Sequence, residues 1–265
     1  NVFNGLSDNI EYVIGEGTSA QYNADWIVGS TFSDGVDISS GYWVRMNSDI
    51  DEGGIDLNGS GFPYHLNREY SLNAGPNLVS IPSMGTFNIA EALPDDSAFT
   101  DIIGQGASAT KVNGNWQGSL SKFEELRGYW IFTNADIDFT FNVNPGSMSR
   151  GIAQTQMTEQ PEDLKFIQSS EQAFYYVDEE VMQEEMVEIG DWFVSFCGST
   201  MAGSRQYLGE TTDIPVMGYT GHHSTAGYCE VGDNVRFKLY QAETGKLLDL
   251  HSSEAIQSWS QNGMV

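Results

Sequence analysis

Few residues of this chain have types and spacing that could do chemistry, and the first group is the oxygen-rich segment around Asn47, Asp49 and Asp51. Alternating oxygen ligands begin a calcium-binding loop, so these three residues are the candidate metal ligands and calcium is the candidate cofactor. The rest of such a loop does not follow, because Glu52 replaces the glycine and Asn58 replaces the final glutamate. On a strand the three side chains would share one face, so we favour a solvated acidic face.

A thiol and a base form the second candidate group, in which Cys197 would act with His222 or His223. No third group that would orient the base is evident nearby, and a buried or disulfide-linked Cys197 is the alternative we favour. The adjacent histidines suit an exposed loop tip better than a metal site. The common nucleophile, phosphate-loop and zinc motifs are also missing. We therefore predict a protein without enzymatic activity.

Three tryptophans are candidates for glycan binding: Trp43, Trp130 and Trp192. An exposed indole offers a flat apolar face on which a sugar ring can stack. Two of them end Gly-Tyr-Trp triplets at equivalent places in a repeated sequence, as a repeated core would require. Packing is therefore the role we favour for them.

Most of these candidate residues lie within an internal sequence repeat. Ile14–Ala20 (IGEGTSA) recurs as Ile103–Ala109 (IGQGASA), and the matches continue in a common order to Asp51 and Asp138. The offset drifts only from 90 residues, between Trp26 and Trp116, to 87, between Trp43 and Trp130. These matches predict two tandem copies of one small β module.

The second copy is preceded by an apolar run, Gly75–Pro82, that predicts a strand. The first copy has no equivalent because the chain starts too late, and its first residue is Asn rather than Met, which suggests a segment of a longer product. We expect the missing strand to come from upstream sequence, or the open edge to be completed by another element or subunit. The expected partners are thus other copies of the chain or neighbouring modules, joined through strand edges.

Beyond residue 163 the chain predicts a separate β domain. Aromatic and β-branched runs at 174–177, 192–196 and 235–240 are separated by turn residues, including two Gly-Asp pairs at 190–191 and 232–233. Short helices are expected at 89–93 and 119–126, and residues 181–188 are a candidate acidic helix or hairpin arm. The predicted fold is all-β, with tandem β repeats followed by an Ig-like or jelly-roll-like β-sandwich. The expected domains are a first, N-terminally incomplete repeat at 1–60, a second repeat at 61–146, a linker at 147–162 and the sandwich at 163–265.

The charge and hydrophobicity of the chain argue against nucleic acid and membranes as partners. Acidic residues outnumber basic ones by 37 to 11, for a formal net charge of -26, so the chain repels nucleic acid and anionic membrane surfaces. No apolar run reaches the roughly 18 residues of a membrane span, which predicts no membrane insertion. Hydrophobic residues make up 40% of the chain, so it should fold, and its charge suits a solvent-facing protein in saline surroundings.

Two resemblances add context to these predictions. The segments Asn77–Pro82 (NLVSIP), Trp116–Ser119 and Arg127–Ile131 (RGYWI) resemble a repeat of secreted bacterial proteins, and this likeness covers residues 1 to 143. Residues 163–265 resemble an uncharacterised β-sandwich module of marine bacterial surface proteins and phage virion proteins. The segments that carry this likeness include Gln172–Tyr176, Ile189–Trp192, Ala202–Arg205, Ile214–Gly218 and Phe237–Tyr240.

The resemblances imply an exposed, modular setting and no particular chemistry. The expected function is a non-enzymatic structural or adhesive component of an extracellular assembly, such as a cell-surface fibre, filament or matrix. A virion fibre or decoration protein and a carbohydrate-binding accessory module are the alternatives. The expected location is accordingly extracellular, at a cell surface or a virion surface.

Overall fold

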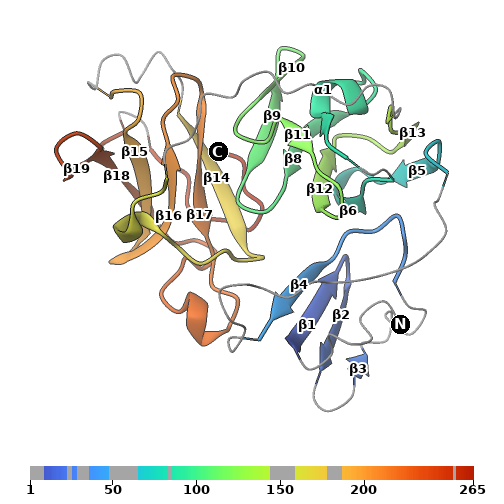
Figure 1. Ribbon diagram of the computed structural model, residues 1–265, viewed down its shortest axis with the longest axis horizontal. Coiled ribbons are helices and arrows are strands. Elements are labelled where there is room, and N and C mark those ends of the chain that lie inside the picture. Colours follow the sequence, from blue (N-terminus) through green and yellow to red (C-terminus); the bar gives the residue numbers. More distant parts are fainter. Residues whose placement is uncertain are drawn as a thin grey trace. The chain divides into compact units, whose positions relative to one another are not determined.

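The computed structural model describes residues 9–22, 26–28, 36–47, 65–82, 85–143, 159–177, 187–252 and 255–265 (Figure 1). Their regular structure is almost entirely β-strand, which confirms the predicted all-β class. The chain forms two compact units: unit 1 comprises Asn1–Thr100 and Lys122–Met148, and unit 2 comprises Asp101–Ser121 and Ser149–Val265.

The first sequence repeat forms an antiparallel sheet in unit 1. Its strands are β1 (Ile10–Gly15), β2 (Thr18–Tyr22), β3 (Trp26–Val28) and β4 (Trp43–Met46), in the order β3-β2-β1-β4. The tight β1–β2 turn places Gly17 at φ +64°, where a residue without a Cβ carries no steric cost. Ile10 and Val13 form its small core.

The second repeat supplies most of the remaining elements of unit 1. They are β5 (Glu69–Leu72), β6 (Gly75–Ser80), β7 (Phe87–Asn88), α1 (Ile89–Ala92), β11 (Lys122–Phe123), β12 (Gly128–Thr133) and β13 (Ile137–Thr140). The apolar run predicted as a strand is β6, which pairs antiparallel with β12 from Ser80↔Gly128 to Gly75↔Thr133. Helix α1 confirms one of the two predicted short helices. The other is wrong, because its residues include β11.

Strand β8 (Phe99–Ile103) begins in unit 1 and ends in unit 2. In unit 2 its last residues pair with β9 (Ser108–Val112), which pairs in turn with β10 (Asn115–Gln117). The repeated residues thus lie on β1, β2 and β3 in one copy and on β8, β9 and β10 in the other. The middle strand of each set, β2 or β9, pairs with the other two. The duplication itself stays a prediction. The compact units divide the chain differently from the expected domain boundaries, since they group residues 101–121 with the C-terminal segment.

Equivalent tyrosines stabilise the loop before the Gly-Tyr-Trp strand in both repeats. The hydroxyl oxygen of Tyr42 accepts a hydrogen bond from the backbone N–H of Asp37 at 2.8 Å. That of Tyr129 accepts one from the backbone N–H of Glu124 at 2.7 Å. In each case the donor lies five residues before the tyrosine, so the repeated triplet serves packing and loop closure in both copies.

Within unit 1 the first repeat meets the free edge of β6. The N–H of Gly41 donates to Leu78 O at 3.0 Å, and the N–H of Ser80 donates to Ser39 O at 2.9 Å. The N–H of Leu78 donates to the carboxylate of Glu16 at 3.0 Å, so a side chain takes the place of the next backbone partner. The prediction that the edge of the first repeat is itself completed by another element or subunit stays a prediction.

Aromatic side chains fill the core of the second repeat. They meet mostly edge to face, with ring centroids 4.9–5.8 Å apart, an arrangement that suits the quadrupoles of the rings. The members of this cluster are Tyr70, Phe99, Phe123, Tyr129, Phe139 and Phe141.

Unit 2 contains a four-stranded sheet and a two-stranded sheet. The strands are β14 (Gln172–Val177), β15 (Trp192–Cys197), β16 (Thr200–Gln206), β17 (Thr212–Met217), β18 (Val235–Gln241) and β19 (Lys246–Asp249), and the short helices η3 (Glu162–Leu164) and η4 (His223–Thr225) accompany them. The larger sheet has the order β16-β15-β18-β19, and β14 pairs with β17. The C-terminal residues add to the smaller sheet, where Phe174 and Met264 form a parallel bridge.

Both faces of β15 are covered. Phe193 and Cys197 belong to cores shared with β17 or the segment that follows it, whereas Trp192 and Val194 pack with Leu164 on the opposite face. This follows from the period of two along a strand. The two predicted Gly-Asp turns are also confirmed: Gly190 and Gly232 have φ values of +107° and +95°, and each following Asp carboxylate accepts a backbone N–H three residues earlier.

No helix in the described part of the chain is long and apolar enough to cross a membrane. The single α-helix there, α1, has four residues.

The two sheets of unit 2 touch backbone to backbone at Gly203. A Cβ at this position would overlap the carbonyl oxygen of Pro215 on β17. That same oxygen accepts a hydrogen bond from the hydroxyl of Ser195 at 2.7 Å. The glycine therefore lets one strand approach another closely while the buried carbonyl keeps a partner.

Replacing Gly203 by alanine should force β16 and β17 apart and lower the free energy of unfolding by about 3 kcal/mol. Urea titration followed by circular dichroism measures the change. Ser199→Ala, in the exposed turn of the same hairpin, is the matched control and should stay within about 0.5 kcal/mol of the wild type. Equal midpoints for the two variants would contradict the close packing.

Candidate functional site

Of the proposed calcium ligands, only Asn47 lies in the described residues, while Asp49 and Asp51 lie outside them. The backbone N–H of Asn47 donates to Asn9 O at 2.8 Å. The part of the chain that is described holds no group of three or more His, Cys, Asp or Glu side chains that could bind a metal. The calcium site stays a prediction.

Two of the equivalent residues in the second repeat form hydrogen bonds with backbone groups. The carboxylate of Asp136 accepts the N–H of Ala74 at 2.8 Å, and the amide of Asn134 donates to Ser97 O at 3.2 Å. Asp138 lies exposed on β13, as a solvated acidic face requires. In this copy, Asp136 and Asn134 therefore hold turns together.

The three tryptophans differ in exposure. Trp192 is only 4% exposed, in a core with Leu164 and Val194, so it offers no face to a sugar and is removed from the glycan candidates. Trp43 and Trp130 are half-buried on β4 and β12. Neither residue is fully buried, so both remain candidates.

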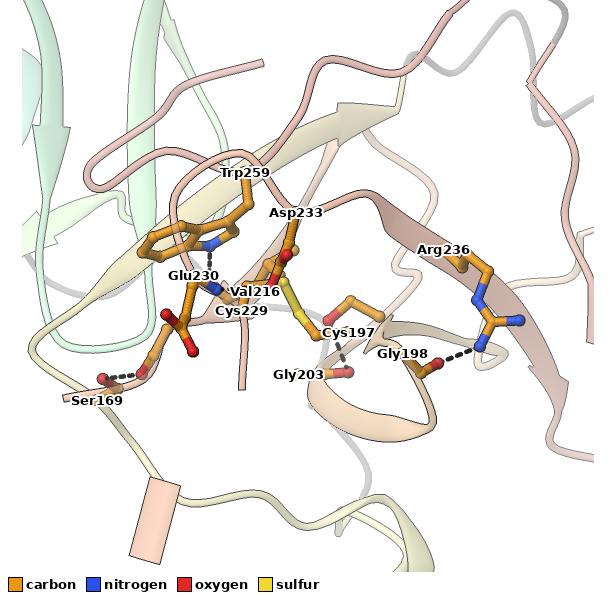
Figure 2. The surroundings of a disulfide bond; sticks show 12 residues. Ser169, Cys197, Gly198, Gly203, Val216, Cys229, Glu230, Asp233, Arg236 and Trp259 are labelled. Atoms are coloured by element: carbon orange, nitrogen blue, oxygen red, sulfur yellow. Dashed lines mark hydrogen bonds between the residues drawn. A yellow bond between two sulfur atoms is a disulfide. The ribbon is translucent and has the colours of Figure 1, made fainter. Parts of the chain in front are cut away.

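Cys197 is joined to Cys229 by a disulfide, and both residues are buried (Figure 2). Cys197 ends β15, and Cys229 forms a bridge with Gly218 just beyond β17, so the bond ties the two sheets of unit 2 together. Trp259 packs in the same core and donates its indole N–H to Val216 O at 3.0 Å. The favoured prediction of a buried or disulfide-linked cysteine is confirmed, and Cys197 has no thiol with which to attack a substrate.

The adjacent histidines lie at η4, as expected for a loop tip. Their ring centroids are 4.0 Å apart, His223 is exposed, and His222 Nδ1 lies 3.0 Å from the hydroxyl of Ser224. His222 also accepts the backbone N–H of Ser224 through the same nitrogen, so this ring closes its own turn.

A polar pocket of about 370 Å³ lies inside unit 1, between the first repeat and strands β5 and β6. Arg68 is its cation: it donates to the hydroxyl of Ser39 at 2.9 Å and lies 3.8 Å from the carboxylate of Asp37. Hydrogen bonds from Ser39, helped by the charge of Arg68, lower the pKa of Asp37. The pocket also exposes Glu16 and Glu69 to a ligand, so it could offer hydrogen bonds to a polar, uncharged molecule.

Unit 2 contains a polar centre that the sequence analysis did not identify. Asp213 on β17 is 1% exposed, and its carboxylate receives five donors. The backbone N–H and hydroxyl of Ser108 donate at 3.1 and 3.0 Å, those of Ser119 at 2.9 and 2.8 Å, and the guanidinium of Arg205 at 3.4 Å. Buried carboxylates are stable only when paired and hydrogen-bonded in this way.

Strand alternation explains which residues surround Asp213. Tyr176 pairs with Asp213 across the β14–β17 ladder, so the two side chains share one face with Gln172. Tyr175 and Ile214 face the other way, into the hydrophobic cores. Residues 101–121, which we name the repeat arm, supply Ser108 and Ser119 to this polar face.

Further hydrogen bonds fix the turn of the repeat arm. Gln172 receives the N–H of Gly106 at 3.3 Å and donates to Gly104 O at 3.0 Å. Arg205 donates to Gly106 O at 2.6 Å. We name the set of these residues the carboxylate clasp: Gly104, Gly106, Ser108, Ser119, Gln172, Tyr176, Arg205 and Asp213.

Burial and the charge of Asp213 raise the pKa of Tyr176 far above its usual value, although a hydrogen bond with Ser108 partly opposes the shift. Burial raises the pKa of Tyr175 to about 12. Both phenols are therefore neutral at physiological pH, and Tyr175 donates to Gln257 O at 2.9 Å. In the clasp the hydroxyls of Ser108 and Ser119 donate to the buried carboxylate of Asp213, so these groups are engaged in hydrogen bonds with one another.

One signal in the sequence could have revealed the clasp. Asp213 directly precedes the apolar run 214–217 on the same strand, and an acid next to such a run must find partners if it is buried with it. The partners themselves could not be found in this way, because Ser108 is 105 residues from Asp213 in the sequence.

No protein-family model, curated protein or solved structure matches this chain. The two resemblances drawn from the sequence therefore stay predictions.

Asp213→Asn should destabilise unit 2 by about 3–5 kcal/mol, because the amide cannot accept all five donors and the half-buried Arg205 loses its counter-charge. Urea unfolding gives the free energy, and hydrogen exchange of residues 104–121 locates the loss. Asp249→Asn, which breaks an exposed pair with Lys238, is the matched control and should leave the midpoint almost unchanged. Slow exchange of the repeat arm in Asp213→Asn would refute the clasp.

Alkaline pH should weaken unit 2 through Tyr175. Its pKa is raised from 10.0 to about 12 in the folded state, so its contribution to stability is complete below pH 10 and disappears as the pH rises through about 12. Urea midpoints measured from pH 8 to 12 should fall less steeply in Tyr175→Phe. Tyr219→Phe, at a more exposed position, should follow the wild-type curve. Identical slopes for the wild type and Tyr175→Phe would contradict this assignment.

Proposed function

We propose that this chain is a non-enzymatic structural or adhesive component of an extracellular assembly, such as a cell-surface fibre, filament or matrix. The disulfide between Cys197 and Cys229 is the observation that carries this proposal. Disulfides persist mainly in oxidising surroundings, outside the reducing cytosol. This one links two sheets across a buried core, a place suited to lasting stabilisation.

The clasp supports a structural role in a second way. Its charged and polar groups, Asp213 and Arg205 above all, are directed at other parts of the same unit. A binding or catalytic centre needs groups that face a ligand. Here Asp213 and Arg205 bind segments of the same unit that are far apart in the sequence. Such contacts stabilise the fold, which is what a structural role requires.

Charge also agrees with an extracellular setting. A formal charge of -26 keeps copies soluble and apart at low salt, and screening within about 10 Å allows close contact in saline media. A virion fibre or decoration protein would need the same acidic, disulfide-linked β modules and is the nearest variant of this proposal.

Carbohydrate binding is the second candidate. The accessible parts of Trp43 and Trp130, together with the polar pocket beside Arg68, favour it. If the chain is adhesive, a glycan would be the molecule to which it adheres.

In the source material, immunogold labelling and electron cryo-microscopy should place the chain outside the cell or on a virion, in a repeating assembly. Alkylation before and after reduction should show Cys197 and Cys229 protected until the disulfide is cleaved. A chain located in the cytosol with both thiols reactive would refute the proposal. A dispersed extracellular chain that binds a glycan array, with binding lost in Trp43→Ala or Trp130→Ala and kept in Ser199→Ala, would favour the second candidate.

A further inference from the structure

Strand β4 has one partner strand among the described residues, whereas its counterpart in the second repeat has two. The sequence matches align Tyr42-Trp43 with Tyr129-Trp130, so β4 corresponds to β12. Strand β12 lies between β8 and β6 in its sheet. In the part of the chain that is described, β4 ends its sheet and pairs only with β1. The edge of β4 that corresponds to the β6 side of β12 is therefore open there.

The hydrogen bonds on the closed edge of β4 show which backbone groups face the open one. The N–H of Asn47 donates to Asn9 O at 2.8 Å, so it points toward the β1 side. Backbone groups along a strand point alternately to its two edges, and those of Val44 and Met46 therefore point away from β1. The extra residue at the register shift belongs to β1, so the alternation along β4 is undisturbed.

The second repeat shows what occupies the equivalent edge. Ile131, the counterpart of Val44, pairs with Asn77 of β6. The side-chain amide of Asn77 donates to Ile131 O at 3.5 Å, so this carbonyl faces β6. The carbonyl of Leu78 accepts a hydrogen bond from the first repeat instead, on the other edge of β6. By the same alternation, the N–H groups of Asn77 and Val79 point to β12.

Exposure at the equivalent positions differs as an open edge predicts. Ile131 is fully buried in the second repeat, whereas Val44 is 39% exposed. Val44 pairs with Val13, so it lies on the face of the sheet that carries the small core of the first repeat. A strand added at this edge would cover the apolar side chain of Val44 and extend that core.

We propose that the open edge of β4 is a docking site for an extended strand of the β6 type, supplied by a neighbouring module that carries the same repeat. The incoming strand runs antiparallel to β4, and its residues equivalent to Asn77 and Gly75 pair with Val44 and Met46. Addition of a strand to an exposed sheet edge is a common mode of recognition, in which main-chain hydrogen bonds supply the affinity. This inference rests on the proposed structural function and names the contact that would join one module to the next.

The sequence of β6 suits this acceptor. Residues 74–82 (AGPNLVSIP) contain no charged side chain, so a strand of this kind adds nothing to the repulsion from a chain with a formal charge of -26. Pro76 lies on the same edge of β6 as Leu78, the edge that faces away from β12. Its missing N–H therefore costs no hydrogen bond in docking and limits further pairing on the far side.

A synthetic peptide of residues 74–82 tests the docking on the intact chain, whose own β6 stays in place. Fluorescence anisotropy of the labelled peptide should show saturable binding below about 1 mM. Hydrogen exchange should slow at residues 43–46. Protection only at residues 129–133 would overturn the proposal, because it would show that the peptide displaces β6.

Val44→Pro removes an N–H on the open edge, so the sheet should tolerate it while the peptide binds about tenfold more weakly or worse. Val44→Ala keeps the N–H and is the matched control, which should lose much less affinity. Circular dichroism checks that both variants fold. Equal affinities of the wild type and Val44→Pro would overturn the proposal.

Modified peptides give the same answer without a change in the protein. A methyl group on the backbone nitrogen of Asn77 blocks the edge that would face β4, so it should abolish binding. The same group on the nitrogen of Leu78 lies on the far edge and should leave the affinity nearly unchanged. Equal binding of the two peptides, or no binding of the unmodified peptide at about 1 mM, would overturn the docking.

The two proposals fail separately. An extracellular chain that does not bind the peptide would refute the docking and leave the structural function standing. A chain found reduced in the cytosol that binds the peptide through β4 would refute the extracellular function and leave the docking standing.

Discussion

The organisation of unit 2 depends on one buried carboxylate. Asp213 is 1% exposed on a strand that is buried throughout, where an ionised acid without partners would be strongly destabilising. Its five donors come from Ser108, Ser119 and Arg205, so the sheet cannot bury this acid unless the repeat arm is in place. A local requirement of one side chain thereby specifies which distant segment covers the sheet. This explains why the compact units divide the chain differently from the sequence repeats.

The disulfide and the clasp stabilise opposite sides of the same sheet by different physics. The bond between Cys197 and Cys229 is covalent, closes a loop of 32 residues, and restricts the unfolded chain by about 3–4 kcal/mol whatever the pH or salt. The clasp consists of hydrogen bonds and one ion pair. The disulfide joins the two sheets to each other, whereas the clasp joins the repeat arm to one of them.

Local pattern was enough to predict the elements. The aromatic runs at β14, β15 and β18, the apolar run at β6 and the turns at Asp191 and Asp233 are each determined by residues within a few positions, and each was found. Long-range partners were not predictable, because no local signal states which strand lies opposite Asp213 or which sulfur reaches Cys197. Trp192 illustrates the same limit, since its burial depends on Leu164, which lies on a separate segment. The pairing of distant segments determines whether a tryptophan binds sugar or fills a core.

The two repeats use the same turn for the same purpose. In unit 1 the turn between β1 and β2 places Glu16 against the free N–H of Leu78 on β6. In unit 2 the equivalent turn between β8 and β9 places Gly104 and Gly106 against Gln172 and Arg205. In both cases the hairpin contacts a segment that follows it in the chain through polar groups. A hairpin that connects each module to the next needs only a new set of hydrogen-bonding partners at every step.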